Sequence, residues 1–513
     1  MGWLRQKRLL TLGLLICLVP SGCANPPKDY ARAPSAAVAS YQETSAGQLF
    51  EETAAEHPGK SGFYMLESGR QAFTSRIAMI DMAEVSLDLQ YYIWASDATG
   101  VILADRLVKA ADRGVRVRLM IDDAGLGISE SLAASLDTHR NIEIRIFNPF
   151  INRDAPVFDF LIDWERVNQR MHNKLMVTDT AVLVIGGRNI GDNYFDVDRD
   201  ANFRDLDLAA AGPVVREVSE VFDHFWNGEW AVPVAALTDR RYTEEDYQDA
   251  LRAIERAMAR NAFPYPLDQD VANLRAELDS IREASIWAPS SVIWDAPVGR
   301  SESARPVATY RALIEELDHV ESEVLVETAY LVLWDSGIDE LHKLTERGVH
   351  VRILTNSLAS NDVIAAHAGH AKYREAYLRS GAELYEFRPD AGAIDQSAFA
   401  SQSTASLHTK AIVFDRKSVF IGSFNLDPRS ARINTEAGLY VESPQLAEQV
   451  IAFMDEGIQP ENSYRVVLDR DGNLSWITQT DGQEVRYDSE PETTFGQRFM
   501  ASFIMLLPIE DQF

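Results

Sequence analysis

The sequence predicts an α/β protein of two halves related by internal duplication. From residue 62 onward, helical and strand patterns alternate, which is typical of α/β layering. Residues 107–118 (LVKAADRGVRVR) return in a similar form as residues 341–352 (LHKLTERGVHVR). A second shared block lies around His172 and again around His408. Both pairs of blocks are about 235 residues apart and occur in the same order, which indicates duplicated halves.

The first repeated block predicts a helix followed by a buried strand. In each copy the helical pattern ends at a glycine, Gly114 or Gly348, and a run rich in β-branched residues follows. Glycine commonly ends a helix because it adopts the left-handed backbone conformation at little cost. We therefore expect strands at about residues 115–121 and 349–354.

These patterns divide the chain into six parts. They are a signal peptide (1–22), a flexible tether rich in Ala, Pro and Ser (23–61), the first half (62–235), a charged helical connector (236–289), the second half (290–457) and a C-terminal tail (458–513). The tail carries an apolar helical stripe, formed by Phe495, Phe499, Phe503 and Leu507. Such a stripe either packs against the protein's own body or lies in the interface of a lipid bilayer.

The charge balance is strongly acidic, with 49 Lys and Arg against 78 Asp and Glu and a net charge of −29. Proteins that bind duplex nucleic acid usually present a basic patch, because phosphate contacts supply their affinity. The acidic balance therefore disfavours a nuclease, and we expect no nucleic-acid partner. It is also a poor match to an anionic bilayer, so contact with a membrane needs another source than net charge.

The N-terminus has the pattern of a secretory signal. Three basic residues within 5–8 precede an apolar run at 9–19, which is too short for a transmembrane helix. Residues 20–23 resemble a bacterial lipobox in which Cys23 is lipidated, although Pro20 stands where lipoboxes usually carry Leu. We expect a lipoprotein of the bacterial cell envelope that faces the periplasm, in either the inner or the outer membrane. The alternatives are a soluble protein cut after Ala24 and an uncleaved anchor.

The chain has two cysteines, Cys17 and Cys23, and both lie in the predicted leader. The mature protein would therefore form no internal disulfide and hold no metal through cysteine. We expect neither a metal nor an organic cofactor.

The second repeated block carries the motif His-x-Lys-x4-Asp. Its residues are His172, Lys174 and Asp179 in the first half, and His408, Lys410 and Asp415 in the second. The apolar alternation that follows each lysine predicts a β-hairpin, which turns at the aspartate. Asp179 and Asp415 are expected to satisfy N–H groups of these turns. Their alternative role is catalytic.

Each hairpin ends in Gly-Gly-Arg-Asn or Gly-Ser-Phe-Asn. The residues Gly187 and Ser423 would let the backbone approach a ligand closely, and Asn189 and Asn425 would add neutral donors. Since residues i and i+2 of a strand share a face, each histidine and its lysine are expected to project together.

Two copies of this motif suit the chemistry of a phosphodiester. One imidazole can attack phosphorus to form a phosphohistidine, while the other protonates the leaving oxygen and later activates the acceptor. Two lysines and two asparagines can surround the phosphoryl oxygens as charge develops. Two halves that meet face to face would supply this set without a metal.

A histidine nucleophile also needs an acceptor for its other ring nitrogen. In the second half Glu436 is the candidate, because it follows the motif in the segment Asn-Thr-Glu. In the first half Asp205 occupies the corresponding place, with Asp207 as the alternative.

These paired motifs resemble the signature of the phospholipase D superfamily. The likeness extends to residues 90–94 (QYYIW), 122–123 (DD), 148–150 (NPF), 170–174 (RMHNK), 186–192 (GGRNIGD), 354–358 (LTNSL), 361–363 (NDV), 367–369 (HAG), 421–430 (IGSFNLDPRS), 434–436 (NTE) and 468–470 (LDR). In these segments the chain looks like the bacterial cardiolipin synthases, most closely those of class C.

The resemblance implies two phospholipase D-like lobes, each a mixed β-sheet flanked by helices. It implies transfer of a phosphatidyl group through a phosphohistidine, with cardiolipin made from phosphatidylglycerol and a donor, either phosphatidylglycerol or phosphatidylethanolamine. The alternatives are hydrolysis to phosphatidic acid, a phosphodiesterase or nuclease, and an inactive lipid-binding scaffold. The segment from Asn361 to His370 would either help to recognise head groups or serve packing and capping.

Overall fold

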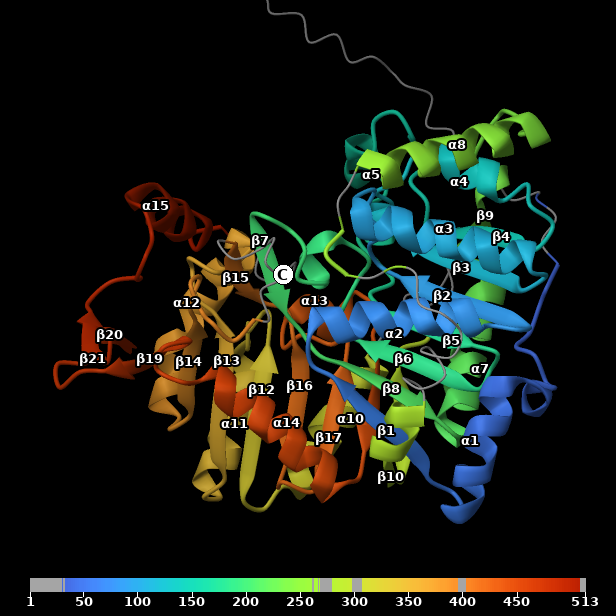
Figure 1. Ribbon diagram of the computed structural model, residues 1–513. Helices are drawn as coiled ribbons and strands as arrows, with labels where there is room; N and C mark the ends of the chain where they lie inside the picture. The colour runs from blue at the N-terminus through green and yellow to red at the C-terminus, as the bar shows by residue number, and fades with distance from the viewer. Residues whose placement is uncertain are drawn as a thin grey trace, which may run out of the picture.

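The computed structural model describes residues 30, 33–260, 263–265, 267, 279–297, 307–394 and 403–507. The predicted leader and Cys23 lie outside these residues. Figure 1 shows two α/β lobes side by side. Within the described ranges, no helix is both long enough and apolar enough to cross a bilayer.

The first lobe contains a nine-stranded sheet with the order β10-β1-β8-β6-β5-β2-β3-β4-β9. Its strands are β1 (Ser61–Leu66), β2 (Ser86–Tyr91), β3 (Arg116–Asp122), β4 (Ile142–Phe147), β5 (Leu175–Thr178), β6 (Val182–Gly186), β8 (Asp207–Ala211), β9 (Ala231–Pro233) and β10 (Ile286–Ala288). β2, β3 and β4 are parallel, and the other pairs are antiparallel.

The second lobe contains a ten-stranded sheet with the order β11-β18-β17-β16-β12-β13-β14-β19-β20-β21. Its strands are β11 (Ser290–Trp294), β12 (Glu323–Thr328), β13 (His350–Asn356), β14 (Glu383–Phe387), β16 (Lys410–Phe414), β17 (Ser418–Gly422), β18 (Ala437–Val441), β19 (Ser463–Leu468), β20 (Leu474–Thr480) and β21 (Gln483–Tyr487). Six consecutive strands, from β18 to β14, repeat the order and directions of β8 to β4 in the first lobe. The predicted α/β fold of two duplicated mixed sheets is therefore confirmed.

Helices cover both faces of each sheet. They are α1 (Ser45–Glu56), α2 (Gly69–Met82), α3 (Ala98–Asp112), α4 (Glu130–Leu136), α5 (Val157–Ile162), α6 (Trp164–Val167), α7 (Pro213–Asn227), α8 (Glu244–Arg260), α10 (Ala308–His319), α11 (Asp335–Glu346), α12 (Ile364–Arg379), α13 (Pro428–Arg432), α14 (Pro444–Gly457) and α15 (Phe495–Ile504). Alternation along β5 shows the arrangement, because Met176 packs with α2 and α3 whereas Leu175 and Val177 pack with α7.

The two lobes share part of their core. One apolar cluster combines α7 of the first lobe with α14 of the second, together with strand residues of both sheets. A short parallel pair also joins the halves, formed by β7 (Ala201–Arg204) and β15 (Thr404–Leu407). The lobes therefore dock through a continuous core, which fixes their relative position.

The expectation of a flexible tether at 23–61 is wrong for its described part. Thr44 caps α1, and Phe50 of this helix is buried against the first lobe. Further back, the Ala37 amide donates to Asp223 at 2.7 Å, and the Ser35 amide donates to Asn227 at 3.1 Å. Hydrogen bonds supply much of the attachment of this segment. Its sequence therefore shows too little apolar pattern to predict that it packs on the lobe.

The predicted connector and the predicted tail are not separate parts, because each contributes strands to the sheet of a lobe. α8 buries Tyr247, Ala250 and Ile254 against the first lobe, and β10 pairs with β1. In the tail, β19 pairs with β14 and continues the second sheet through β20 and β21. The apolar stripe of α15 is exposed. The expectation that this stripe packs against the body of the protein is therefore wrong.

Candidate active site

A cavity of about 500 Å³ lies where the two lobes meet, beyond the carboxyl ends of β2 and β12. It is lined by residues of both halves: Tyr92, Ile93, Phe160, Trp164, Asn168, His172, Asn189 and Tyr194 from the first, and Tyr330, Asp362, Val363, Ala366, His408, Asn425, Asp427, Arg429, Ser430 and Asn434 from the second. Ligands of α/β folds commonly bind beyond the carboxyl ends of parallel strands. The structure thus brings both predicted histidines and both predicted asparagines to one cavity.

His172 is held by the second half. Its Nδ1 lies 2.9 Å from Oε2 of Glu436, and its backbone N–H donates to the carbonyl of Thr435 at 2.9 Å. The ring of Tyr92 meets the imidazole edge to face, with centroids 5.2 Å apart. The side chain is 11% exposed, so it reaches the cavity from a well-packed position.

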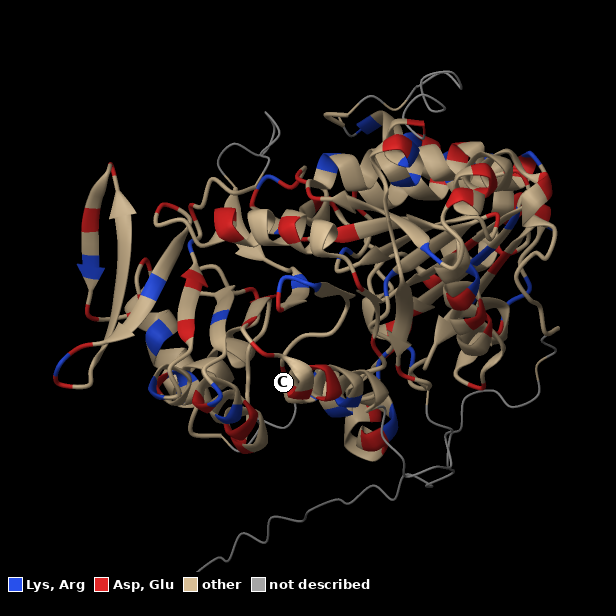
Figure 2. Ribbon diagram, turned by 90° about the horizontal axis from the view of Figure 1, so that it is seen from below, with Lys and Arg blue, Asp and Glu red and all other residues tan. Residues whose placement is uncertain are grey.

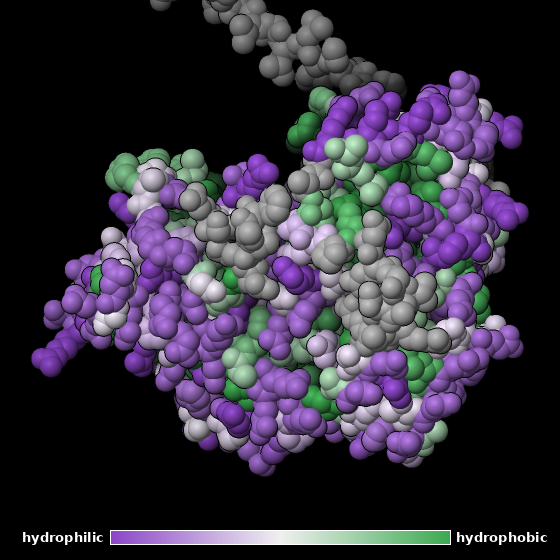
Figure 3. Space-filling view, in the orientation of Figure 1, coloured by the Kyte–Doolittle hydropathy of each residue, from purple (hydrophilic) through white to green (hydrophobic). Residues whose placement is uncertain are grey.

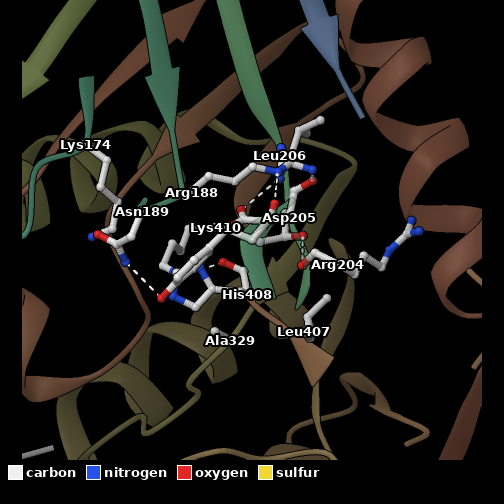
Figure 4. A network of polar contacts seen from close by, with 12 residues as sticks. Lys174, Arg188, Asn189, Arg204, Asp205, Leu206, Ala329, Leu407, His408 and Lys410 are labelled. Carbon is white, nitrogen blue, oxygen red and sulfur yellow. Dashed lines mark hydrogen bonds and ion pairs between the residues drawn. The ribbon is translucent and has the colours of Figure 1, made fainter. Parts of the chain in front are cut away.

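His408 is held by the first half in the same way. Its Nδ1 lies 2.6 Å from Oδ2 of Asp205, and its backbone N–H donates to the carbonyl of Arg204 at 2.7 Å. Figure 4 shows His408 and Asp205 facing each other at the end of β15 and β7. Each histidine is therefore bonded both to a carboxylate of the opposite half and to the backbone just before that carboxylate.

This crossed arrangement differs from the pairing that sequence order suggests. The sequence associates Glu436 with His408 and Asp205 with His172, whereas the structure exchanges the partners. Asp207, the alternative to Asp205, instead pairs with Arg76 at 3.0 Å within the first lobe. The exchange follows from the docking of the lobes, which a pattern within one half does not encode.

Each lysine side chain folds back onto the backbone of the histidine two residues before it. Lys174 Nζ donates to the carbonyl of His172 at 2.5 Å, and Lys410 Nζ donates to the carbonyl of His408. Both ammonium groups are buried. An ammonium has three donors, so each lysine retains donors for an anionic ligand.

The two asparagines take different partners. Asn189 accepts a hydrogen bond from the Ile93 amide and donates to the Tyr194 hydroxyl, both at 3.0 Å. The Oδ1 atom of Asn425 is buried without a hydrogen-bond partner among the described residues, at a position that lines the cavity. A buried polar atom of this kind calls for a ligand or water.

Gly187 and Ser423 lie against the two carboxylates. A Cβ atom at Gly187 would lie 2.1 Å from Oδ1 of Asp205, so only glycine fits there. At the corresponding place in the second half, Ser423 Oγ donates to Glu436 at 2.5 Å. The close approach predicted at Gly187 is therefore to the Asp205 carboxylate.

Asp179 and Asp415 are remote from the cavity lining. Asp179 accepts the amides of Glu84, Val85 and Ser86 at 2.8–3.0 Å, and Asp415 accepts the amides of residues 321–323. Both residues have positive φ at the hairpin turn. They tie each hairpin to the start of the adjacent strand, β2 in the first lobe and β12 in the second.

Burial determines the charge of the histidine–carboxylate pairs. It lowers the pKa of His172 and of His408 well below the usual value, and Lys174 and Lys410 lower both further. Burial raises the pKa of Asp205, and it raises the pKa of Glu436 to about 7. The imidazoles are therefore neutral at pH 7. The Nδ1–H group of each imidazole donates a hydrogen bond to the carboxylate. The lone pair of Nε2 is therefore available to a ligand in the cavity.

Burial also weakens the charge of the lysines. The pKa of Lys410 is lowered to about 8, although Asp205 and Glu436 act against this shift. The pKa of Lys174 is lowered well below its usual value, again chiefly by burial. Binding of an anion would favour the charged form of both side chains.

Several cavity residues were not singled out as site residues by the sequence. Arg429 lines the cavity and donates to Asn168 at 2.8 Å, so it links the two halves. Tyr194 and Tyr330 also line the cavity, and the Tyr330 hydroxyl donates to Asp362 at 2.9 Å. Arg429 stands four residues after Asn425, and this closeness to the motif is the signal that could have identified it.

His367 and His370 point away from the cavity lining into a buried polar cluster. His370 Nε2 lies 3.0 Å from Glu386, and His367 Nε2 lies 3.1 Å from Glu490. Arg374 bonds both carboxylates, which attaches the tail to α12. These contacts favour the packing interpretation for the two histidines, whereas Asp362, Val363 and Ala366 of the same segment line the cavity.

No group of three or more His, Cys, Asp or Glu side chains in the described ranges has the arrangement of a metal site. The cavity lining holds the cation Arg429 and several neutral donors, and its carboxylates, Asp362 and Asp427, already accept hydrogen bonds from Tyr330 and Ser430. Such a set suits a phosphate group more than a cation.

Comparison with known proteins places the chain in a family. The model for "Cardiolipin synthase, PLD-like domain" matches residues 77–226 and 313–457. The chain is 35% identical to cardiolipin synthase C of Escherichia coli, over 89% of this chain and 97% of that protein. It is 32% identical to an uncharacterized protein of Helicobacter pylori strain J99 (91% and 92%), and 23% identical to a cardiolipin synthase of Oceanobacillus iheyensis (76% and 67%).

Among solved structures, phosphatidylserine synthase of Haemophilus influenzae Rd KW20 is similar in fold. Its TM-score is 0.54 at 16% identity, and the match covers 82% of this chain and 91% of that one. The two sheets and the paired motifs thus define an enzyme of the phospholipase D superfamily. The chain belongs to the cardiolipin synthase family within it, which confirms the resemblance seen in the sequence.

Proposed function

We propose that this enzyme is a phosphatidyltransferase that makes cardiolipin from phosphatidylglycerol and a phosphatidyl donor. The observation that carries the proposal is the pair of crossed histidine–carboxylate contacts, which present two neutral imidazoles to one cavity. The names of the relatives in the family support a phospholipid substrate. The donor is phosphatidylglycerol or phosphatidylethanolamine.

In the first half-reaction, Nε2 of one histidine attacks phosphorus as the bond from phosphorus to the head-group oxygen breaks. The second histidine takes up a proton from solvent as the anionic phosphate binds, and it gives this proton to the departing oxygen. In the second half-reaction that histidine takes the proton from a hydroxyl of phosphatidylglycerol. The oxygen then attacks phosphorus, the bond to histidine breaks, and cardiolipin is released.

The remaining site residues support these steps. Glu436 and Asp205 keep the imidazoles oriented and stabilise positive charge on the rings as it develops. In this mechanism Lys174, Lys410 and Asn425 donate to the phosphoryl oxygens in a buried site, where such donors act strongly.

The second candidate is hydrolysis, in which water resolves the same intermediate and yields phosphatidic acid. The aromatic side chains of Tyr92, Phe160 and Trp164 on the cavity wall favour an organic acceptor over water. This observation places transfer first and hydrolysis second.

The direct test supplies the purified full-length protein with labelled phosphatidylglycerol, with and without phosphatidylethanolamine. Formation of cardiolipin with release of glycerol or ethanolamine supports the proposal. Phosphatidic acid as the sole product would replace it with hydrolysis. His172→Ala is the control for a contaminating activity.

We propose further that Cys23 carries a lipid anchor that holds the enzyme in the bacterial envelope, facing the periplasm. The support is the sequence pattern of basic, apolar and small residues before Cys23. Incorporation of labelled fatty acid into the wild type, and its loss in Cys23→Ala, is the expected result. Equal labelling of the two proteins would refute the anchor.

A further inference from the structure

The exposed large apolar side chains of the described chain fall into two short segments. The first surrounds α5, and the second comprises α15 and the residues after it. They are Val157, Phe158, Leu161, Ile162 and Trp164 in the first, and Phe495, Phe499, Met500, Phe503, Met505, Leu506 and Leu507 in the second. Exposed apolar side chains that gather in this way mark an interaction surface.

Both segments are held so that the apolar side faces outward. On α5, the buried carboxylate of Asp159 accepts amides of residues 151 and 152, which turns Leu161 to solvent with 78% of it exposed. On α15, Thr494 and Gln497 form a capping box and Ala501 faces the protein. Phe495 and Phe499 are 77% and 60% exposed. The exposure thus results from ordered local structure.

The two segments flank the mouth of the active-site cavity. Phe160 and Trp164 line the cavity on the side of α5. On the other side α15 packs on α12, whose first turn contributes Ala366 to the lining. In Figure 1, α5 and α15 both lie along the upper side of the molecule, on either side of the junction between the lobes. Figure 3 shows hydrophobic surface at both places.

Charge does not explain an affinity of this face for a membrane. The net charge of the chain is −29, and Figure 2 shows acidic residues spread over the helices of both lobes. Residues 495–507 contain no acidic residue and a single basic one, Arg498. An anionic bilayer therefore has to be bound through apolar insertion, for which an amphipathic helix with large side chains is suited.

We infer that α5 and α15 form one docking face, which inserts its apolar side chains into the interface of a phospholipid bilayer and sets the cavity mouth on the head groups. A protein partner that covered both helices would close the cavity between them. A bilayer in the same position delivers the substrate. The inference rests on the proposed function for the identity of the substrate, whereas insertion itself requires no turnover.

The test of insertion uses a tryptophan probe in the full-length chain. Phe503→Trp is placed on α15, and Gln483→Trp is the matched control at an exposed position of β21. Each protein is bound to phosphatidylglycerol vesicles with plain or brominated acyl chains. Bromine quenches tryptophan at the depth of the acyl chains, so we expect more quenching, relative to the wild type, for Phe503→Trp than for Gln483→Trp. Equal quenching of the two probes would overturn the docking face.

The second test separates docking from chemistry. The double variant Phe499→Ser/Phe503→Ser should lower kcat/KM on phosphatidylglycerol vesicles about tenfold, because its apolar contact is lost. On short-chain phosphatidylglycerol dissolved as monomers, the same variant should stay within about twofold of the wild type. Phe499→Leu/Phe503→Leu should restore activity on vesicles, and Ser502→Ala on the same helix is the control.

Three outcomes would contradict either the docking face or the proposed function. Equal loss on vesicles and on monomeric lipid would overturn the docking face. A change in sedimentation of the serine variant without lipid would assign the face to self-association instead. If the wild type turns over neither form of lipid, the proposed function fails, and the tryptophan probe still decides whether the face inserts.

Discussion

At the scale of single residues, each histidine receives its carboxylate from the opposite half of the chain. His172 bonds Glu436, and His408 bonds Asp205, and both imidazoles are neutral because burial and the two lysines disfavour their charge. The second half supplies the carboxylate for His172, and the first half supplies the carboxylate for His408. Neither half therefore contains a complete site. The chemistry therefore depends on the pair.

Removal of either histidine should abolish turnover. We expect His172→Ala and His408→Ala each to lower the rate by about 10³-fold or more, because one loses the nucleophile and the other the acid and base. The measurement is cardiolipin formation from labelled phosphatidylglycerol, with circular dichroism to show that the variants are folded. A variant that keeps a tenth of the wild-type rate would argue against the shared site.

The lysines predict an alkaline limit to activity. Lysine carries its charge below its pKa, and burial lowers the pKa of Lys410 to about 8, so attraction of the lipid phosphate is lost as pH rises through this value. We expect kcat/KM, which reports the free enzyme, to fall above about pH 8. In the complex the phosphate holds the lysine charged, so kcat should fall at higher pH. A kcat/KM that stays constant to pH 10 would contradict this assignment.

The residue types of the site could be predicted from sequence, but their pairing could not. The repeated motif identifies His172, His408 and the lysines because the chemistry of a phosphodiester needs them at that spacing. Glu436 follows His408 closely in the chain, yet it bonds His172, because docking of the lobes sets the contact. The motif does not identify Arg429, because its contact with Asn168 depends on the same docking of the lobes.

At the scale of the elements, the two hairpins carry the motifs at the same place in both sheets. β5 and β6 pair antiparallel in the first lobe, as β16 and β17 do in the second. Asp179 and Asp415 fasten the hairpin turns, and the return strands end against the carboxylates. The hairpins thus convert a local sequence pattern into a fixed position of the site.

The end of the β6 strand tolerates no side chain at Gly187. In Gly187→Ala the new Cβ would lie 2.1 Å from the Asp205 carboxylate, so Asp205 has to move away from His408. We expect kcat to fall about 100-fold, since a misplacement of about 1 Å has an effect of this size. The matched change Ser423→Ala removes one hydrogen bond to Glu436 and should cost about tenfold. Wild-type kcat in Gly187→Ala would contradict the steric argument.

Elements with strong periodicity could be predicted, and elements held by polar contacts could not. The helix and strand around Gly114 and Gly348 are recognisable because apolar spacing and glycine coincide. α1 lies in an Ala-rich stretch with weak periodicity, and it is fixed by Phe50 and by hydrogen bonds from Ser45 to Glu84. The sequence did not predict β19 to β21 as part of the second sheet, which β19 joins by pairing with β14 and which β20 and β21 extend.

At the scale of the whole molecule, duplication explains why one site forms between two similar lobes. Six strands repeat in the same order, and a shared apolar cluster joins α7 to α14. Arg204 is a further link, because it lies in the first half and bonds Glu327 and Glu456 of the second. This position is directly before Asp205.

Loss of the Arg204 link should destabilise the molecule. Arg204→Met leaves Glu327 buried without its partner, which should lower the free energy of unfolding by about 3 kcal/mol. Arg240→Met is the control, because its pair with Asp246 lies at the surface and should contribute much less to stability. Urea denaturation of both variants provides the comparison. Equal stability of the two would show that the buried link does not join the lobes energetically.

The most direct test of a single composite site is the stoichiometry of the covalent intermediate. Rapid acid-free quenching of the enzyme with phosphorus-labelled phosphatidylglycerol, followed by mapping of the labelled peptide, counts the phosphatidyl groups on each chain. A shared site predicts at most one group per chain, on either His172 or His408 but always the same one. Two groups per chain, or label on both histidines, would show that each half acts alone.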